Sequence, residues 1–137
     1  MDRGPYGMAE PALRGDVTIE GLNARGLGHL PGWFGFEALE LAPGRLLSRL
    51  TIRPEMLAPN GFLHAATVIA LADTSAGYAT VAHLPAGARS FTTVELKSNF
   101  FGTQTEGELH CEARAVHLGR STQVWDAEVS GGDGRRL

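Results

Sequence analysis

The chain has 137 residues and a formal net charge of −3, from 12 basic and 15 acidic side chains. This length suits one domain with a hydrophobic core, and the lack of a basic excess argues against binding a nucleic-acid backbone. Cys111 is the single cysteine, so a disulfide within the chain is excluded and a reducing compartment is expected. The first residues lack the apolar core of a signal peptide, and no apolar stretch suits a membrane span. We therefore expect a cytoplasmic, globular protein.

The N-terminal part of the chain contains turn signals and two predicted strands. Residues 1–15 are rich in Gly and Pro and are predicted to be a loose segment, which leaves residues 16–137 as a single domain. Residues 17–27 form a short element whose type the sequence leaves open. We then expect a turn at residues 30–33, a strand over 34–41, a turn at Pro43-Gly44 and a strand over 46–52 with two-residue periodicity.

Residues 65–82 are dominated by small and aliphatic side chains without proline, a composition that favours a helix. A helix that is apolar on nearly every side is expected to be buried. Asp73 is the only carboxylate in this run, and its helical neighbours three and four residues away are all apolar or small. Desolvation makes a carboxylate a stronger base, so Asp73 is a functional candidate. The alternative is a structural Asp satisfied by a buried donor.

Three more strands are predicted after the helix. Over residues 90–101 the alternation places Phe91 and Thr93 on one face and Val94 and Leu96 on the other. The chain then reads as a strand over 106–117, a turn at 118–121, a strand over 122–130 and a Gly-rich turn at 131–134. So few residues follow this turn that we expect a very short final strand or a chain that has been cut.

The predicted order is therefore two strands, one long helix and three strands. Tight turns join most neighbouring strands, which favours an antiparallel sheet. A sheet that curls round the helix is the arrangement that covers it on most sides, so we expect an α+β fold.

Several short motifs follow one another in the sequence: Leu30-Pro-Gly-Trp-Phe-Gly, Pro43-Gly-Arg, Gly61-Phe-Leu-His64, Leu71-Ala-Asp73, Thr93-Val-Glu-Leu, Asn99-Phe and His117-Leu-Gly-Arg120. This ordered set resembles the hotdog-fold acyl-CoA thioesterases of the phenylacetic-acid type. The resemblance covers roughly residues 30–134 and implies a five- or six-stranded antiparallel sheet wrapped around one central helix. It also implies dimers, often paired into tetramers, in which two subunits share each active site.

The resemblance further implies catalytic roles for four residues. Asp73 matches a carboxylate that acts as general base on water or as nucleophile on the acyl carbon. Ala65 matches the position whose backbone N–H binds the thioester carbonyl at the helix start. Thr93 matches a hydroxyl residue that comes from the partner subunit and helps to hold the water. His64 matches a supporting histidine, and a packed or capping histidine is an equal alternative.

The candidates for substrate binding are two residues in the turn before the helix and two cationic side chains. Asn60 and Gly61 form that turn, and Arg120 matches a residue near the CoA moiety, whose phosphates suit cationic side chains. Lys97 is a second cation, and an ordinary surface charge is the alternative for both cations. The His residues and Cys111 show no metal-ligand spacing, so we expect no metal and no other cofactor.

Two departures from the family pattern concern the rate. The family usually has His-Gly-Gly where this chain has His64-Ala65-Ala66, so methyl groups stand where the backbone approaches the substrate. Three residues before Gly61, where the family commonly has Asn or Gln, this chain has Ala58. Both changes are compatible with an enzyme of lower catalytic rate.

We therefore expect an acyl-CoA thioesterase that forms a homodimer or homotetramer and releases a free acid and CoA. The alternative is a protein that binds acyl-CoA without hydrolysing it, as a sensor or degenerate subunit. A hydratase is less well supported, because no His and acid pair is placed for that chemistry. The aromatic residues suit an acyl pocket or the core, with the core as the better interpretation; they are Trp33, Phe34, Phe36 and Trp125.

Overall fold

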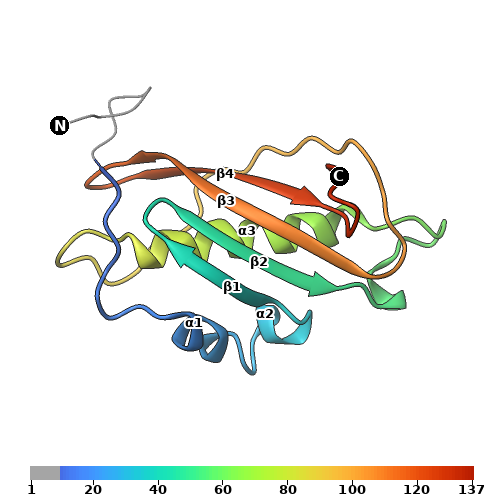
Figure 1. Ribbon diagram of the computed structural model, residues 1–137, viewed down its shortest axis with the longest axis horizontal. Coiled ribbons are helices and arrows are strands. Elements are labelled where there is room, and N and C mark those ends of the chain that lie inside the picture. Colours follow the sequence, from blue (N-terminus) through green and yellow to red (C-terminus); the bar gives the residue numbers. More distant parts are fainter. Residues whose placement is uncertain (1–9) are drawn as a thin grey trace.

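The computed structural model describes residues 10–137 and shows a four-stranded antiparallel sheet packed on one long helix (Figure 1). The sheet contains, in sequence order, β1 (Glu37–Ala42), β2 (Arg45–Thr51), β3 (Glu108–Leu118) and β4 (Gln123–Ser130). The helical elements are α1 (Ile19–Arg25), α2 (Leu30–Trp33), the 3-10 turn η1 (Pro54–Met56) and α3 (Ala65–Ala82). The predicted α+β class and the pairing of neighbouring strands are confirmed.

Helix α3 has the limits that its composition predicts. His64 caps the start, because its Nδ1 accepts a hydrogen bond from the Ala66 N–H at 2.9 Å. The residues that α3 buries recur at helical spacing on the side that faces the sheet; they are Thr67, Val68, Leu71, Ser75, Ala79 and Ala82. The expectation of a helix buried on nearly every side is therefore wrong for the single chain.

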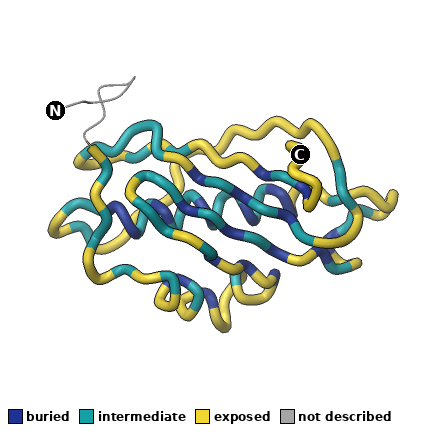
Figure 2. Tube along the Cα trace, in the orientation of Figure 1, coloured by how far each residue is buried: buried dark blue, intermediate teal, exposed yellow. Residues whose placement is uncertain are grey.

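The inner face of the sheet supplies the other half of the core. Alternate residues of β2 and β3 are buried and pair across the strands, as Leu46 with Ala113 and Leu50 with Leu109. This alternation confirms the predicted period of two. Figure 2 shows the result as a buried band that runs along the middle strands and α3.

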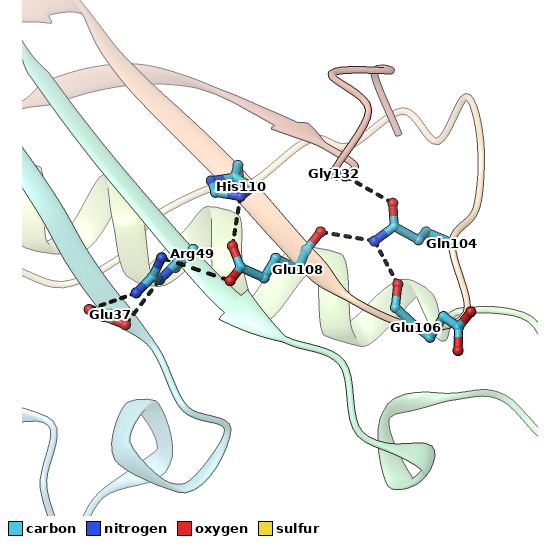
Figure 3. Close-up of polar contacts among 7 residues, drawn as sticks. All are labelled: Glu37, Arg49, Gln104, Glu106, Glu108, His110 and Gly132. Carbon is cyan, nitrogen blue, oxygen red and sulfur yellow. Dashed lines mark hydrogen bonds and ion pairs between the residues drawn. The ribbon is translucent and has the colours of Figure 1, made fainter.

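The outer face of the same strands carries charges. Arg49 of β2 lies 3.1 Å from Glu37 of β1 and 3.8 Å from Glu108 of β3, and the Glu108 carboxylate lies 3.0 Å from His110 Nε2 (Figure 3). Exposed pairs of this kind stabilise a fold only slightly. An apolar inner face and a charged outer face are typical of an antiparallel sheet with one side in solvent.

The segment over residues 90–101, predicted as a strand, forms none. The amides of residues 90–100 make no backbone hydrogen bond within the described part of the chain, and residues 89–102 are all exposed. The segment is an extended trace along the β4 side of the sheet (Figure 1). The sheet of residues 10–137 therefore has four strands rather than five or six.

Smaller differences occur at the ends of the described chain. Residues 30–33 form one helical turn, α2, rather than a non-helical turn, and the unassigned residues 17–27 contain α1. After the Gly-rich turn, Ser130 and Arg136 form a single bridge, which is the very short final strand. The predicted loose segment, residues 1–15, lies mostly outside the described residues. Among residues 10–137, no helix has the length and apolar character needed to cross a membrane.

Candidate active site

Asp73 lies on the side of α3 that faces away from the sheet. It is two residues from Leu71 and two from Ser75, both fully buried in the core, and two residues turn a helix by more than half a revolution. Asp73 is half-buried in the single chain rather than buried. The expectation of a carboxylate enclosed by apolar side chains is thus wrong for one chain by itself.

A polar contact inside the core fixes the turn of α3 that carries Asp73. Ser75 donates a hydrogen bond to Leu71 O at 2.7 Å, and its Oγ lies 2.6 Å from the Oγ of Ser48 on β2. The buried hydroxyl pair holds α3 against the sheet and so sets where the Asp73 side chain leaves the helix.

Burial raises the pKa of the Cys111 thiol, which lies beside this hydroxyl pair, to about 11, so this cysteine is protonated and inert as a nucleophile.

A long, open groove of about 1610 Å³ follows residues 88–101, one side of α3 and the edge strand β4, and it extends to outer-face residues of the sheet such as Arg45 and Glu112. Asp73 and Thr93 both line it. Thr93 Oγ1 donates to Asp73 Oδ1 at 3.5 Å, a long and weak hydrogen bond. The segment approaches α3 closely because Gly77 has no side chain: a Cβ there would lie 3.0 Å from the Phe91 ring. The resemblance places Thr93 across a subunit interface, whereas the structure places it beside Asp73 of its own chain.

Both candidate cations line the same groove. Lys97 Nζ donates to Asn99 Oδ1 at 3.4 Å, and Arg120 lies in the exposed turn between β3 and β4. The groove thus contains a carboxylate, a hydroxyl group and two cations among the predicted residues.

The start of α3 forms a separate group of candidates. The Ala65 N–H has no acceptor within residues 10–137, whereas the next amide, Ala66, is bonded to His64 Nδ1. From Ala65 to Asp73 is eight residues, or about 12 Å along the helix axis. One chain therefore does not bring the Ala65 N–H and the Asp73 carboxylate to the same atom.

The turn before α3 is held by its own hydrogen bonds. Asn60 Oδ1 accepts from the Phe62 N–H at 3.1 Å, and Gly61 has a φ of 88°, which favours glycine. Asn60 and Gly61 thus shape the turn and do not line the groove beside Asp73. For His64, the capping role is confirmed.

The aromatic candidates divide between core and surface. Phe34 and Phe36 are buried in the hydrophobic core, and Trp125 packs against it, so the core interpretation is confirmed for them. Trp33 is 64% exposed, with the Arg53 guanidinium 5.2 Å from its ring centroid. Among residues 10–137, no three His, Cys, Asp or Glu side chains are grouped as metal ligands would be.

Comparison with known proteins gives four consistent similarities. The family model described as the thioesterase superfamily matches residues 60–137. The 1,4-dihydroxy-2-naphthoyl-CoA hydrolase of Escherichia coli is 26% identical over 122 residues, which cover 87% of each chain. The proofreading thioesterase EntH of Cronobacter turicensis is 28% identical over 123 residues, 88% of this chain and 87% of that protein. A crystal structure of a mutant of thioesterase PA1618 from Pseudomonas aeruginosa matches with a TM-score of 0.85 at 27% identity, covering 90% of this chain and 89% of that one.

Proposed function

Because the chain belongs to the thioesterase superfamily and has its hotdog fold, we propose that it hydrolyses an acyl-CoA to a free acid and CoA. The observation that carries the proposal is the half-buried Asp73 carboxylate in a groove that Thr93, Lys97 and Arg120 also line. A carboxylate there can accept a proton from the attacking water or attack the acyl carbon itself. The two cations suit the phosphates of CoA.

A thioester hydrolase also needs a donor for the oxyanion that develops on the carbonyl. The Ala65 N–H is free for this role and lies at the positive end of the α3 dipole. Since one chain holds it about 12 Å from Asp73, we propose that the donor comes from a second copy of the chain. The active site then lies between two subunits, and His64 supports it by capping the helix start.

Two features of the single chain favour a second copy. Residues 90–100 form an extended stretch without backbone partners, and Val94 within it is 89% exposed. Such an unpaired edge pairs readily with another strand. The side of α3 that carries Asp73 is also only partly covered. A homodimer, alone or paired into a homotetramer, would cover both.

For the acyl group we propose an aromatic acid, as in the phenylacetic-acid type. The support comes from the name of the Escherichia coli relative, whose acyl group, 1,4-dihydroxy-2-naphthoyl, is aromatic. Thiol release measured across short, long and aromatic acyl-CoAs tests this choice, and a preference for an aliphatic chain would contradict it.

The catalytic role of Asp73 is tested by Asp73→Asn, which keeps the shape of the side chain and removes the base. We expect thiol release to fall by about 100-fold or more, because a general base contributes about 10²–10⁴ in rate. Glu20→Gln, an exposed carboxylate on α1, is the control and should keep the rate. An unchanged rate in Asp73→Asn would remove Asp73 from the mechanism.

The second candidate function is binding of acyl-CoA without hydrolysis. Ala58 and the Ala65-Ala66 pair favour it, because they replace family residues near the reacting group. Calorimetry separates the two functions, since saturable binding of acyl-CoA without any thiol release would support the binder and contradict the enzyme.

A further inference from the structure

A second cavity, of about 260 Å³, lies at the C-terminal end of α3. It shares only Leu84 with the groove that contains Asp73. Its lining combines three arginines with one carboxylate and three apolar residues: Arg14, Arg25, Arg89, Asp16, Val17, Val81 and Leu84. Three guanidinium groups around one small cavity are unusual in a chain whose net charge is −3.

Arg14 is the arginine of this cavity that already has partners. Its Nε donates to Asp16 Oδ1 at 3.2 Å, and its Nη1 donates to Ala88 O at 2.8 Å. Asp16, the one acid that lines the cavity, is therefore neutralised by Arg14 and leaves the other two guanidinium groups without a counter-ion.

Arg25 and Arg89 have no ion pair and no hydrogen bond within residues 10–137. The Arg25 guanidinium lies 5.7 Å from the centroid of the Tyr78 ring, which holds its plane without neutralising its charge. Both residues are exposed, so their guanidinium groups are accessible to an anion from solution, which would supply the missing counter-charge.

The end of α3 does not require these two cations. A helix C-terminus attracts positive charge through its free carbonyls, but the last carbonyls of α3 already have donors. The His83 N–H donates to Thr80 O and Val81 O, the Arg14 N–H donates to Ala82 O at 2.9 Å, and His83 Nδ1 lies 2.7 Å from Ala79 O. Capping of the helix therefore does not account for Arg25 and Arg89.

We propose that this cavity is a binding site for a phosphate group, with Arg25 and Arg89 as its main ligands and Arg14 beside them. Guanidinium forks bind phosphate oxygens in pairs, with geometric specificity that an ordinary surface charge lacks. The volume of about 260 Å³ is slightly below that of sites for drug-sized ligands, so it suits a phosphate monoester or a pyrophosphate. The phosphate can belong to a free compound or to the nucleotide end of CoA.

Calorimetric titration of the whole chain with pyrophosphate tests the site without reference to catalysis. We expect saturable binding that weakens at higher salt, and a loss of about tenfold or more in affinity for the double variant Arg25→Gln with Arg89→Gln. Arg49→Gln, which removes an arginine paired with Glu37 on the outer face of the sheet and lining neither cavity, is the control and should bind as the wild type does.

The proposal is overturned if the wild type shows no saturable binding, or if the double variant binds pyrophosphate as tightly as the wild type. Circular dichroism and the melting temperature confirm that the variants fold. A competition arm then identifies the source. If CoA displaces pyrophosphate, and the double variant loses affinity for CoA as it does for pyrophosphate, the natural ligand is the nucleotide end of CoA. If CoA leaves pyrophosphate binding unchanged, the natural ligand is a free phosphate compound.

Discussion

At the scale of single residues, the backbone N–H of Ala65 is the proposed donor to the thioester carbonyl, a role that no side chain at this position could take over. Ala65 is the first residue of α3, a position that accommodates proline well. His64 before it has φ −69° and ψ 133°, the extended conformation that a following proline requires. Ala65→Pro therefore removes the proposed donor and leaves the helix intact.

We expect Ala65→Pro to lower kcat by about 100-fold or more, the usual consequence of losing one oxyanion donor. The melting temperature should change little, because this N–H makes no hydrogen bond in residues 10–137. Ala65→Gly keeps the N–H and is the matched control, with a rate near that of the wild type. If Ala65→Pro hydrolyses acyl-CoA at the wild-type rate, the donor lies elsewhere.

At the scale of elements, His83 joins three parts of the fold at the end of α3. Its Nδ1 lies 2.7 Å from Ala79 O, and its Nε2 accepts a hydrogen bond from the Gly44 N–H at 2.8 Å. Its ring lies 5.0 Å from the Trp125 ring on β4, centroid to centroid. These bonds need a neutral ring that donates at Nδ1 and accepts at Nε2, and burial lowers the pKa of His83 below 6.5.

This lowered pKa predicts the direction in which stability depends on pH. Below the unfolded pKa of about 6.5, the unfolded His83 binds a proton that the folded ring resists, so unfolding is favoured. The stabilisation is complete above that pH and is lost as the pH falls toward the folded pKa. We expect the free energy of unfolding in urea to fall between pH 7.5 and pH 5, and to fall less in His83→Gln.

His110→Gln is the control for this measurement, because His110 lies on the charged outer face of the sheet (Figure 3). The His110→Gln variant should keep most of the pH dependence that the free energy of unfolding shows in the wild type. Equal pH dependence in the wild type and His83→Gln would show that His83 is not the group responsible.

Comparison of the elements shows how far the sequence predicts the fold. The limits of α3 follow from residues inside it and from its own cap, so local sequence suffices. The strands β2 and β3 follow from alternation over a buried face. Residues 90–101 alternate in the same way but form no strand, because a strand also needs a neighbour and the described chain supplies none.

The same distinction applies to the candidate site. Asp73 stands out in the sequence because it is the one carboxylate in an apolar helix. The exposure of Asp73 could not be predicted from the sequence. It depends on which side of α3 packs against the sheet, and tertiary contacts decide that. The cavity with Arg25 and Arg89 left no sequence signal either, since segments that are far apart in the chain form it.

At the scale of the whole molecule, the proposed dimer depends on the extended segment along the β4 side of the sheet (Figure 2). Val94→Pro removes a backbone donor and restricts the chain where pairing between copies is proposed. We expect sedimentation to give a dimer or larger for the wild type and a 14.6 kDa monomer without thiol release for the variant. Val94→Thr keeps the donor and should remain associated and active. A wild type that hydrolyses acyl-CoA as a monomer would contradict the shared site.

The most direct measurement of the central claim, that Asp73 of one subunit works with the Ala65 N–H of another, is complementation between inactive variants. Asp73→Asn and Ala65→Pro are each expected to be inactive alone. When co-expressed in equal amounts, half of the dimers contain one chain of each kind, and each such dimer keeps one of its two sites intact. Thiol release should then recover to about a quarter of the wild-type rate. A mixture that is no more active than the separate variants would contradict a site shared in this way.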